Sequence, residues 1–120
     1  MAIHTSSQDG VLTIRLLDER LIDQAQIQRL VDDVTAALGK SEEENIVLDF
    51  SQVQFMASAM LGKLVQLNKK SKEWKAKLKL CSISPDIYEV FKITKLHKVF
   101  DIEKDEEAAR KAFQKRGLFR

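Results

Sequence analysis

The sequence predicts a single α/β domain over residues 1–120, with a mostly parallel sheet and an antiparallel hairpin or edge strand at its N-terminus. Two observations lead to this fold class. Short apolar runs rich in branched residues alternate with longer segments whose apolar residues recur every three or four positions. Nothing marks a linker, since the chain has one proline and neither a low-complexity stretch nor an internal repeat.

The N-terminal third of the chain supplies two predicted strands and a first helix. Ala2–Ser6 is an edge strand with a weak signal, and Val11–Leu17 alternates apolar and polar residues as a half-buried strand does. Asp18–Arg20 is a polar loop. From Asp23 the period changes to that of a helix, and Gly39 is its natural stop. One face of this helix is apolar and contains Ile27, Leu30, Val31, Val34, Ala37 and Leu38.

The middle of the chain contains the most informative stretch. Asn45–Phe50 is a short, branched, apolar run that predicts a buried strand. A polar turn, Ser51–Gln54, follows it. Ser58 then stands where a new helix begins, and the apolar spacing after it predicts about four helical turns, to near Lys72.

The last third continues the alternation. Lys77–Ile83 is the next predicted strand, and Ser84 with Pro85 supplies an N-cap and a first helical position for a short helix. That helix ends at Phe91. Val99–Ile102 is a last short strand, and a terminal helix follows from Asp105 to Gly117.

Ser58 is predicted to be the N-cap of its helix, with its hydroxyl among backbone N–H groups that have no partner inside the helix. Such a terminus favours negative charge, so a phosphate on Ser58 would be well placed and would change the surface that a partner meets. The alternative is an ordinary capping serine. The residues alone leave both interpretations open.

Composition indicates a cytoplasmic protein. No apolar run approaches the roughly 20 residues that cross a bilayer, and the N-terminus lacks the features of a signal peptide. The single cysteine, Cys81, excludes an internal disulfide and lies in a predicted strand, where a small core residue is expected rather than a nucleophile.

Charge is unevenly distributed. Residues 1–57 carry ten acidic and four basic residues, whereas residues 58–120 carry eight acidic and sixteen basic ones. Seven lysines lie between Lys63 and Lys79, but the single tryptophan gives no series of stacking aromatics. We therefore interpret the lysines as a solvated surface and expect no nucleic-acid partner.

Catalytic and cofactor motifs are missing from the sequence. No phosphate-binding glycine motif is present, and His4 and His97 have no neighbours at metal-ligand spacing. Ser58, His97 and Asp49 could be combined into a triad on paper, but geometry rather than composition defines a triad. The sequence thus predicts neither an enzyme nor a cofactor or metal site.

Three segments resemble the STAS domain, and within it the bacterial anti-sigma-factor antagonists. The first is Ile46–Met56, a hydrophobic strand followed by an aspartate and a loop that ends in Phe-Met. The second is Ala57–Gly62, standing where the family usually has Asp-Ser-Ser/Thr/Ala-Gly-Leu-Gly. The third is Leu80–Phe91, a strand, a Ser-Pro turn and a short helix. The resemblance implies a four- to five-stranded mixed sheet, with about four helices mainly on one side.

The resemblance also implies a function. An unmodified antagonist captures an anti-sigma factor, often itself a serine-protein kinase, and so frees a sigma factor. Phosphorylation at the serine that corresponds to Ser58 ends the capture, and a phosphatase restores it. The alternatives are a constitutive scaffold subunit of a stress-signalling or membrane transport complex, or a nucleotide binder, although no phosphate loop supports the latter.

The partner-binding surface implied by the resemblance surrounds Ser58. Its residues depart from the family pattern, because Ala57 replaces the aspartate, Ala59 removes a second hydroxyl and Met60 replaces the glycine. If exposed, Met56 and Met60 would suit an adaptable surface, and inward-facing methionines are the alternative. A neighbouring turn would contribute Glu19 and Asp23. The sequence does not indicate the oligomeric state.

Overall fold

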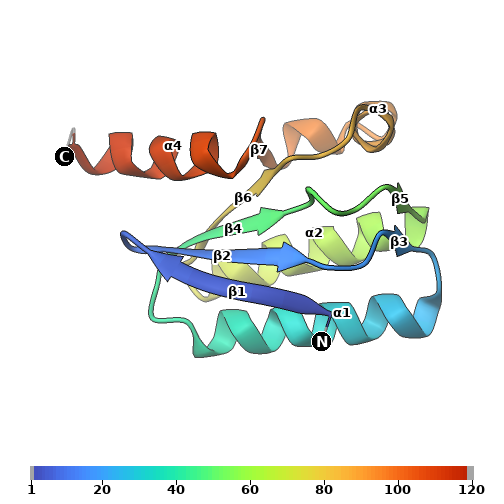
Figure 1. The fold of residues 1–120 in the computed structure, drawn as a ribbon, viewed down its shortest axis with the longest axis horizontal. Helices are drawn as coiled ribbons and strands as arrows, with labels where there is room; N and C mark the ends of the chain where they lie inside the picture. Colours follow the sequence, from blue (N-terminus) through green and yellow to red (C-terminus); the bar gives the residue numbers. More distant parts are fainter. Residues whose placement is uncertain (1, 119–120) are drawn as a thin grey trace.

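A five-stranded sheet in the order β1-β2-β4-β6-β7 forms the centre of the molecule (Figure 1), which we describe from a computed structural model of residues 2–118. β1 is antiparallel to β2, and the remaining neighbours are parallel. The predicted mixed, mostly parallel sheet is therefore confirmed. The strands are β1 Ile3–Gln8, β2 Val11–Leu16, β4 Asn45–Asp49, β6 Lys77–Cys81 and β7 Asp101–Glu103.

The predicted N-terminal hairpin is also confirmed. Asp9 and Gly10 connect β1 to β2, with φ angles of 55° and 79°. Two consecutive residues with positive φ form the turn that matches the twist of the flanking strands, and an Asp-Gly pair adopts it readily.

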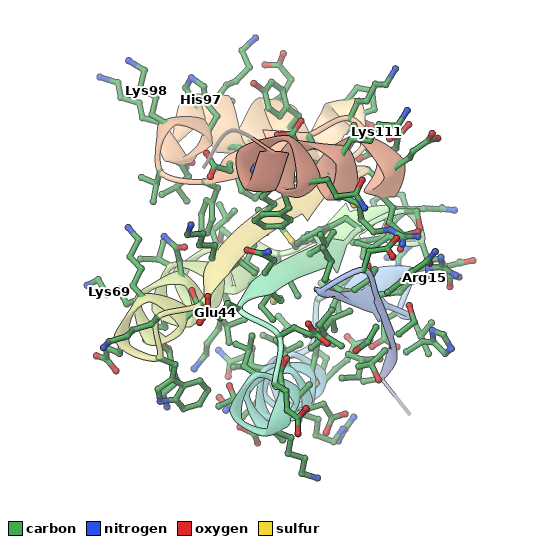
Figure 2. The ribbon with its side chains drawn as sticks, turned by 90° about the vertical axis from the view of Figure 1, so that its left-hand side faces the viewer. Arg15, Glu44, Lys69, His97, Lys98 and Lys111 are labelled. Carbon is green, nitrogen blue, oxygen red and sulfur yellow. The ribbon has the colours of Figure 1, made fainter. Side chains whose placement is uncertain are left out.

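Four α-helices surround the sheet on both faces (Figures 1 and 2). α1 and α2 cover one face, α3 contributes Ile87 and Phe91 to the core on that same side, and α4 covers the opposite face. Three of the helices therefore pack on one side, as predicted. The helices are α1 Gln24–Lys40, α2 Ser58–Glu73, α3 Pro85–Ile93 and α4 Glu106–Leu118, and a short 3-10 helix, η1, spans Leu96–Lys98.

Strand alternation divides the core in two. Leu12, Ile14 and Leu16 of β2 point toward α1 and α2 and belong to the larger core. The smaller core lies under α4 and consists of Val11, Val47, Cys81, Ala109 and Phe113. Because successive side chains of a strand point to opposite faces, the branched strands that are buried on both faces supply both cores.

The structure contains two features that were not predicted, the 3-10 helix η1 and a second, small sheet. β3 (Arg20–Leu21) and β5 (Phe55–Met56) form a separate two-stranded parallel sheet, where a polar loop and the end of a turn were predicted. Strands of two residues are too short to show a period of two, so their pairing leaves no signal in the sequence. Helix and strand ends elsewhere differ from prediction by a few residues; α1, for example, passes Gly39 and ends at Lys40.

Cys81 lies in β6 and is fully buried, as predicted for a small core residue. Burial, with a smaller contribution from the nearby charge of Asp49, raises the pKa of the Cys81 thiol from 9.0 to about 12. The thiol is therefore protonated and unreactive in the folded protein at neutral pH.

The raised pKa of Cys81 predicts a loss of stability in alkaline solution. The folded protein holds the thiol proton more tightly than the unfolded chain, so this contribution is complete below pH 9.0 and is lost as the pH rises toward 12. Over that range the free energy of unfolding should fall by up to about 1.4 kcal/mol per pH unit more in the wild type than in Cys81→Ala. Urea unfolding at stepped pH measures the two slopes, and equal slopes would contradict the prediction.

Within the described part of the chain, residues 2–118, we find no helix with the length and apolar character that a bilayer crossing demands.

Candidate functional site

Ser58 is exposed and is the first residue of α2. The prediction that Ser58 is the N-cap is wrong by one residue, because the extended backbone of Ala57 (φ −71°, ψ 151°) occupies that position. A methyl group cannot accept a hydrogen bond, so the helix start lacks a side-chain cap. Among the described hydrogen bonds, none uses the Ser58 hydroxyl for capping, which argues against an ordinary capping serine.

The electrostatics of this helix start favour an anion. The first turn of α2 contains no acidic residue, and the N-cap Ala57 offers the first backbone N–H groups its carbonyl, which accepts from the Met60 N–H at 3.0 Å, but no side-chain acceptor. Unpaired N–H groups and the helix dipole together give such a terminus a partial positive charge. A negatively charged group on Ser58 would therefore lie in a favourable field.

The two-stranded sheet of β3 and β5, called the small sheet below, fixes the position of Ser58 relative to the loop after β2. The Ala57 backbone N–H donates to the Leu21 carbonyl at 2.8 Å, and the Gln54 and Phe55 N–H groups donate to the Glu19 carbonyl at 2.8 and 3.0 Å. Two segments separated by more than thirty residues are thus joined by backbone hydrogen bonds. The predicted neighbour of Ser58, the turn that contains Glu19, does lie beside it.

An ion pair between the half-exposed Arg15 and the buried Asp49 holds the turn that leads to this sheet. Asp49, at the end of β4, is 2% exposed and accepts a hydrogen bond from Arg15 Nε at 3.1 Å. Its other oxygen accepts from the Ser51 backbone N–H at 2.8 Å. The turn after β4 is therefore anchored to β2 through one carboxylate, which helps to fix the path of the chain toward Ser58.

Asp23 has a structural role. Its carboxylate accepts a hydrogen bond from the Gln26 backbone N–H at 3.0 Å, so Asp23 is the N-cap of α1. The residue is exposed, and its predicted contact with a partner stays a prediction.

Met56 and Met60 differ in how deeply their side chains are buried. Met56 is half-buried in β5, but Met60 is only 1% exposed and belongs to the larger core. The expectation that Met60 is an exposed contact residue is therefore wrong. In the first turn of α2, Ser58 and Ala59 face solvent, whereas Met60 and Leu61 lie on the side that packs against the sheet.

Two exposed apolar side chains that sequence analysis did not single out lie next to Ser58 along the small sheet. Phe55 is 53% exposed and Ile22 is 47% exposed. The Arg20 guanidinium lies over the Phe55 ring, 4.9 Å from its centroid. The sequence did contain one signal for this exposed side chain, because Phe55 is an aromatic residue directly after the polar turn Ser51–Gln54. We use the name Ser58 face for the surface made of Glu19, Arg20, Ile22, Phe55, Met56, Ala57, Ser58 and Ala59.

The hypothetical triad is not assembled. Asp49 is engaged with Arg15 and the backbone of Ser51. His97 lies in η1 with its ring edge-on to Tyr88 at 6.3 Å between centroids. None of the described hydrogen bonds joins either residue to Ser58, and no group of three or more potential metal ligands occurs in the described residues.

Comparison with known proteins agrees with this geometry. The STAS domain family matches residues 2–109. A protein of Bordetella bronchiseptica that carries the name putative anti-sigma factor antagonist BtrV is 28% identical over 106 residues, covering 88% of this chain and 89% of its own.

Solved structures share the fold. An anti-sigma-factor antagonist (STAS) domain protein from Planctomyces limnophilus superimposes with a TM-score of 0.79 at 24% identity, covering 93% of this chain and 98% of its own. The Bacillus cell-fate determinant SpoIIAA in its phosphorylated form superimposes with a TM-score of 0.66 at 20% identity, covering 92% of this chain and 99% of its own. The chain belongs to the STAS domain family and is similar to proteins named as anti-sigma factor antagonists.

Proposed function

We propose that this protein is a non-catalytic regulatory module that captures an anti-sigma factor of the serine-protein-kinase type, and that phosphorylation of Ser58 ends the capture. One observation carries the proposal: an exposed serine hydroxyl, free of a capping role, stands at the start of α2 within a partly apolar surface. The proposed partner acts on transcription, so the proposal places the protein in the cytoplasm.

The Ser58 face has the composition of a protein-binding surface. Phe55 and Ile22 expose large apolar side chains beside Ser58, and Arg20 stacks on the Phe55 ring. Aromatic and arginine side chains are enriched among the residues that dominate binding energy in protein interfaces. Small residues next to Ser58, Ala57 and Ala59, would allow a partner to approach the hydroxyl closely.

The effect of phosphorylation follows from charge. A phosphoserine adds about two negative charges and a bulky group to the middle of this surface. In the free protein the α2 N-terminus would stabilise that charge and water would solvate it. In the complex the charge would be buried without a matching cation, at a cost of several kcal/mol. The similarity to SpoIIAA, whose phosphorylated form has this fold, supports the proposal.

The family pattern places an aspartate at the position of Ala57, and this chain has no carboxylate there. The acceptor hydroxyl would therefore depend on the kinase for its orientation and for the removal of its proton. A kinase matched to this surface is part of the proposal, as is a phosphatase that removes the phosphate.

Incubation with the anti-sigma kinase and ATP is expected to add one phosphoryl group, located at Ser58 by peptide mass spectrometry. Size-exclusion chromatography of the mixture should then show release of the kinase. Ser58→Ala is the matched control, which should stay unmodified and bound. Capture that continues after complete phosphorylation, or an unmodified protein with an active kinase, would contradict the switch and favour a constitutive scaffold.

A further inference from the structure

β1 is an edge strand of the five-stranded sheet, and every second residue of it bonds to β2. The Leu17 N–H donates to the Ala2 carbonyl, which fixes the alternation of hydrogen bonds along the hairpin. The backbone N–H and C=O groups of Ile3, Thr5 and Ser7 therefore point away from the sheet. No described hydrogen bond uses these outward groups.

This edge lacks the features that commonly protect an edge strand from pairing. Natural proteins protect such edges with lysine, with proline or with a bulge. β1 has the sequence Ile-His-Thr-Ser-Ser-Gln, without a formal charge at neutral pH and without proline, and its pairing with β2 is regular over all six residues. The backbone of β1 is thus suited to accept one further strand.

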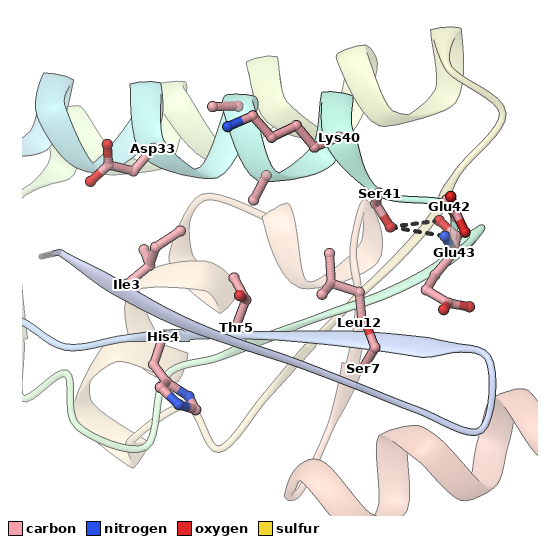
Figure 3. A pocket seen from close by; sticks show the side chains of 12 residues that line it. Ile3, His4, Thr5, Ser7, Leu12, Asp33, Lys40, Ser41, Glu42 and Glu43 are labelled. Atoms are coloured by element: carbon pink, nitrogen blue, oxygen red, sulfur yellow. Dashed lines mark hydrogen bonds between the residues drawn. The ribbon is translucent and has the colours of Figure 1, made fainter.

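A groove borders the edge, between β1 and α1 (Figure 3). Its volume is about 760 Å³, and Ile3, Thr5 and Ser7 are among the residues that line it. Their partners in β2 belong to the larger core on the side of α1. Directly paired side chains point to the same face of a sheet. Side chains of an added strand that lie opposite Ile3, Thr5 and Ser7 would therefore also enter this groove.

The two ends of the groove are acidic. Asp33 lies at the end near Ile3, whereas Glu42 and Glu43 lie beside Ser41 at the end near Ser7 (Figure 3). No described ion pair uses any of these three carboxylates. A cationic side chain at either end would therefore meet negative charge that no described side chain compensates.

The middle of the groove has a different character. Ala36 and Ala37 lie between Asp33 and Lys40 along α1, and they line the groove with small apolar side chains. The Lys40 ammonium reaches back toward this middle part (Figure 3). A cation would be repelled there, whereas an apolar side chain would fit against the two alanines.

We propose that this edge binds an extended segment of another protein as a sixth strand, and that the segment has the pattern basic-x-apolar-x-basic. The two basic residues would lie opposite Ile3 and Ser7, and the apolar residue would lie opposite Thr5. The pattern reads the same in both directions, so charge permits either strand orientation. In the antiparallel orientation all outward backbone groups of these three residues would be paired, in about six hydrogen bonds.

Charge disfavours a second copy of this chain as the occupant. The β1 strand of another copy has no basic side chain to place at the acidic ends of the groove. Pairing of two β1 strands would also bring the acidic ends of two grooves toward each other. The partner is therefore expected to be a different protein with a basic, extended segment.

The groove is separate from the Ser58 face. It lies along α1, whereas β3, β5 and the start of α2 lie at the end of the molecule opposite the β1–β2 turn (Figure 1). The inference therefore goes beyond the proposed function and does not depend on it.

Two synthetic peptides test the charge pattern. One contains Lys-Thr-Val-Thr-Lys and the other Glu-Thr-Val-Thr-Glu, within the same flanking serines and glycines and with the same fluorescent label. Fluorescence anisotropy should show that the lysine peptide binds the wild-type protein at least about tenfold more tightly than the glutamate peptide. Equal affinities, or no binding of the lysine peptide at the highest soluble protein concentration, would overturn the proposal.

A pair of variants on α1 locates the binding surface. Asp33→Lys reverses the charge at one end of the groove and should weaken binding of the lysine peptide by about tenfold. Asp32→Lys is the matched control, because Asp32 is exposed on the same helix but does not line the groove. Its affinity should stay within about twofold of the wild type. Equal losses in the two variants would mean that the peptide binds elsewhere.

A proline in β1 tests the strand pairing. Thr5→Pro removes an outward N–H and none of the hydrogen bonds to β2, and edge strands tolerate proline at such positions. It should abolish binding of the lysine peptide, whereas Thr5→Ala should bind normally. Circular dichroism checks that both variants are folded.

Amide hydrogen exchange of the wild type gives a second measurement that does not depend on the folding of Thr5→Pro. The bound lysine peptide should protect the amides of Ile3, Thr5 and Ser7 from exchange. Unchanged exchange at all three amides in the peptide complex would overturn the proposal, as would full binding by a folded Thr5→Pro.

Discussion

Ser58→Asp is expected to bind the anti-sigma partner at least tenfold more weakly than the wild type, a loss of more than about 1.4 kcal/mol. The carboxylate would stand at the exposed start of α2, in the centre of the Ser58 face. Binding would bury this carboxylate against the partner without a cation to pair with it, and the desolvation free energy of the unpaired charge opposes binding. Isothermal titration calorimetry with the purified partner measures the change.

Two control variants separate this effect from general effects of charge. Ser58→Ala should bind as well as the wild type, because the hydroxyl has no capping role to lose. Gln66→Asp introduces the same charge at an exposed position farther along α2, outside the Ser58 face, and should change the affinity little. Equal losses in Ser58→Asp and Gln66→Asp would mean that the Ser58 face is not the binding surface.

Met60→Ala is expected to lower the free energy of unfolding by about 2–4 kcal/mol. Met60 is 1% exposed and packs in the larger core, so its truncation leaves a cavity below the first turn of α2. Alanine is the best helix former, so helix propensity would not account for the loss. Urea denaturation followed by circular dichroism provides the measurement.

Met56→Ala is the matched control for this cavity. Met56 is half-buried, and the same truncation there should cost clearly less stability. If Met60 instead pointed to solvent, as a contact residue would, the change at position 60 would stay within about 0.5 kcal/mol. That result would contradict the packing of α2 described above.

Much of the fold was predictable because its signals are local. The strands β2, β4 and β6 are apolar and branched, and α1 has a continuous apolar face, so their types and order follow from periodicity. The Asp9-Gly10 turn and the Ser84-Pro85 helix start are also local, since each depends on the backbone preferences of one or two residues.

The surface around Ser58 was only partly predictable. The sequence placed a serine at the start of a helix, but a shift of one residue decides whether that serine caps the helix or stands free. Ala57 became the N-cap because its N–H is bonded to Leu21, a contact between distant segments. The exposure of Phe55 likewise depends on the pairing of β5 with β3.

The sequence by itself determined the α/β class, the order of strands and helices, and an exposed serine at the head of α2, because short-range periodicity and turn preferences encode these features. Only the tertiary structure decided that Met60 is buried, that β3 and β5 pair beside Ser58, and that the outer edge of β1 borders a groove. Each of these features depends on contacts between segments that are distant in the sequence, and the local pattern of residues does not specify which distant segments come into contact.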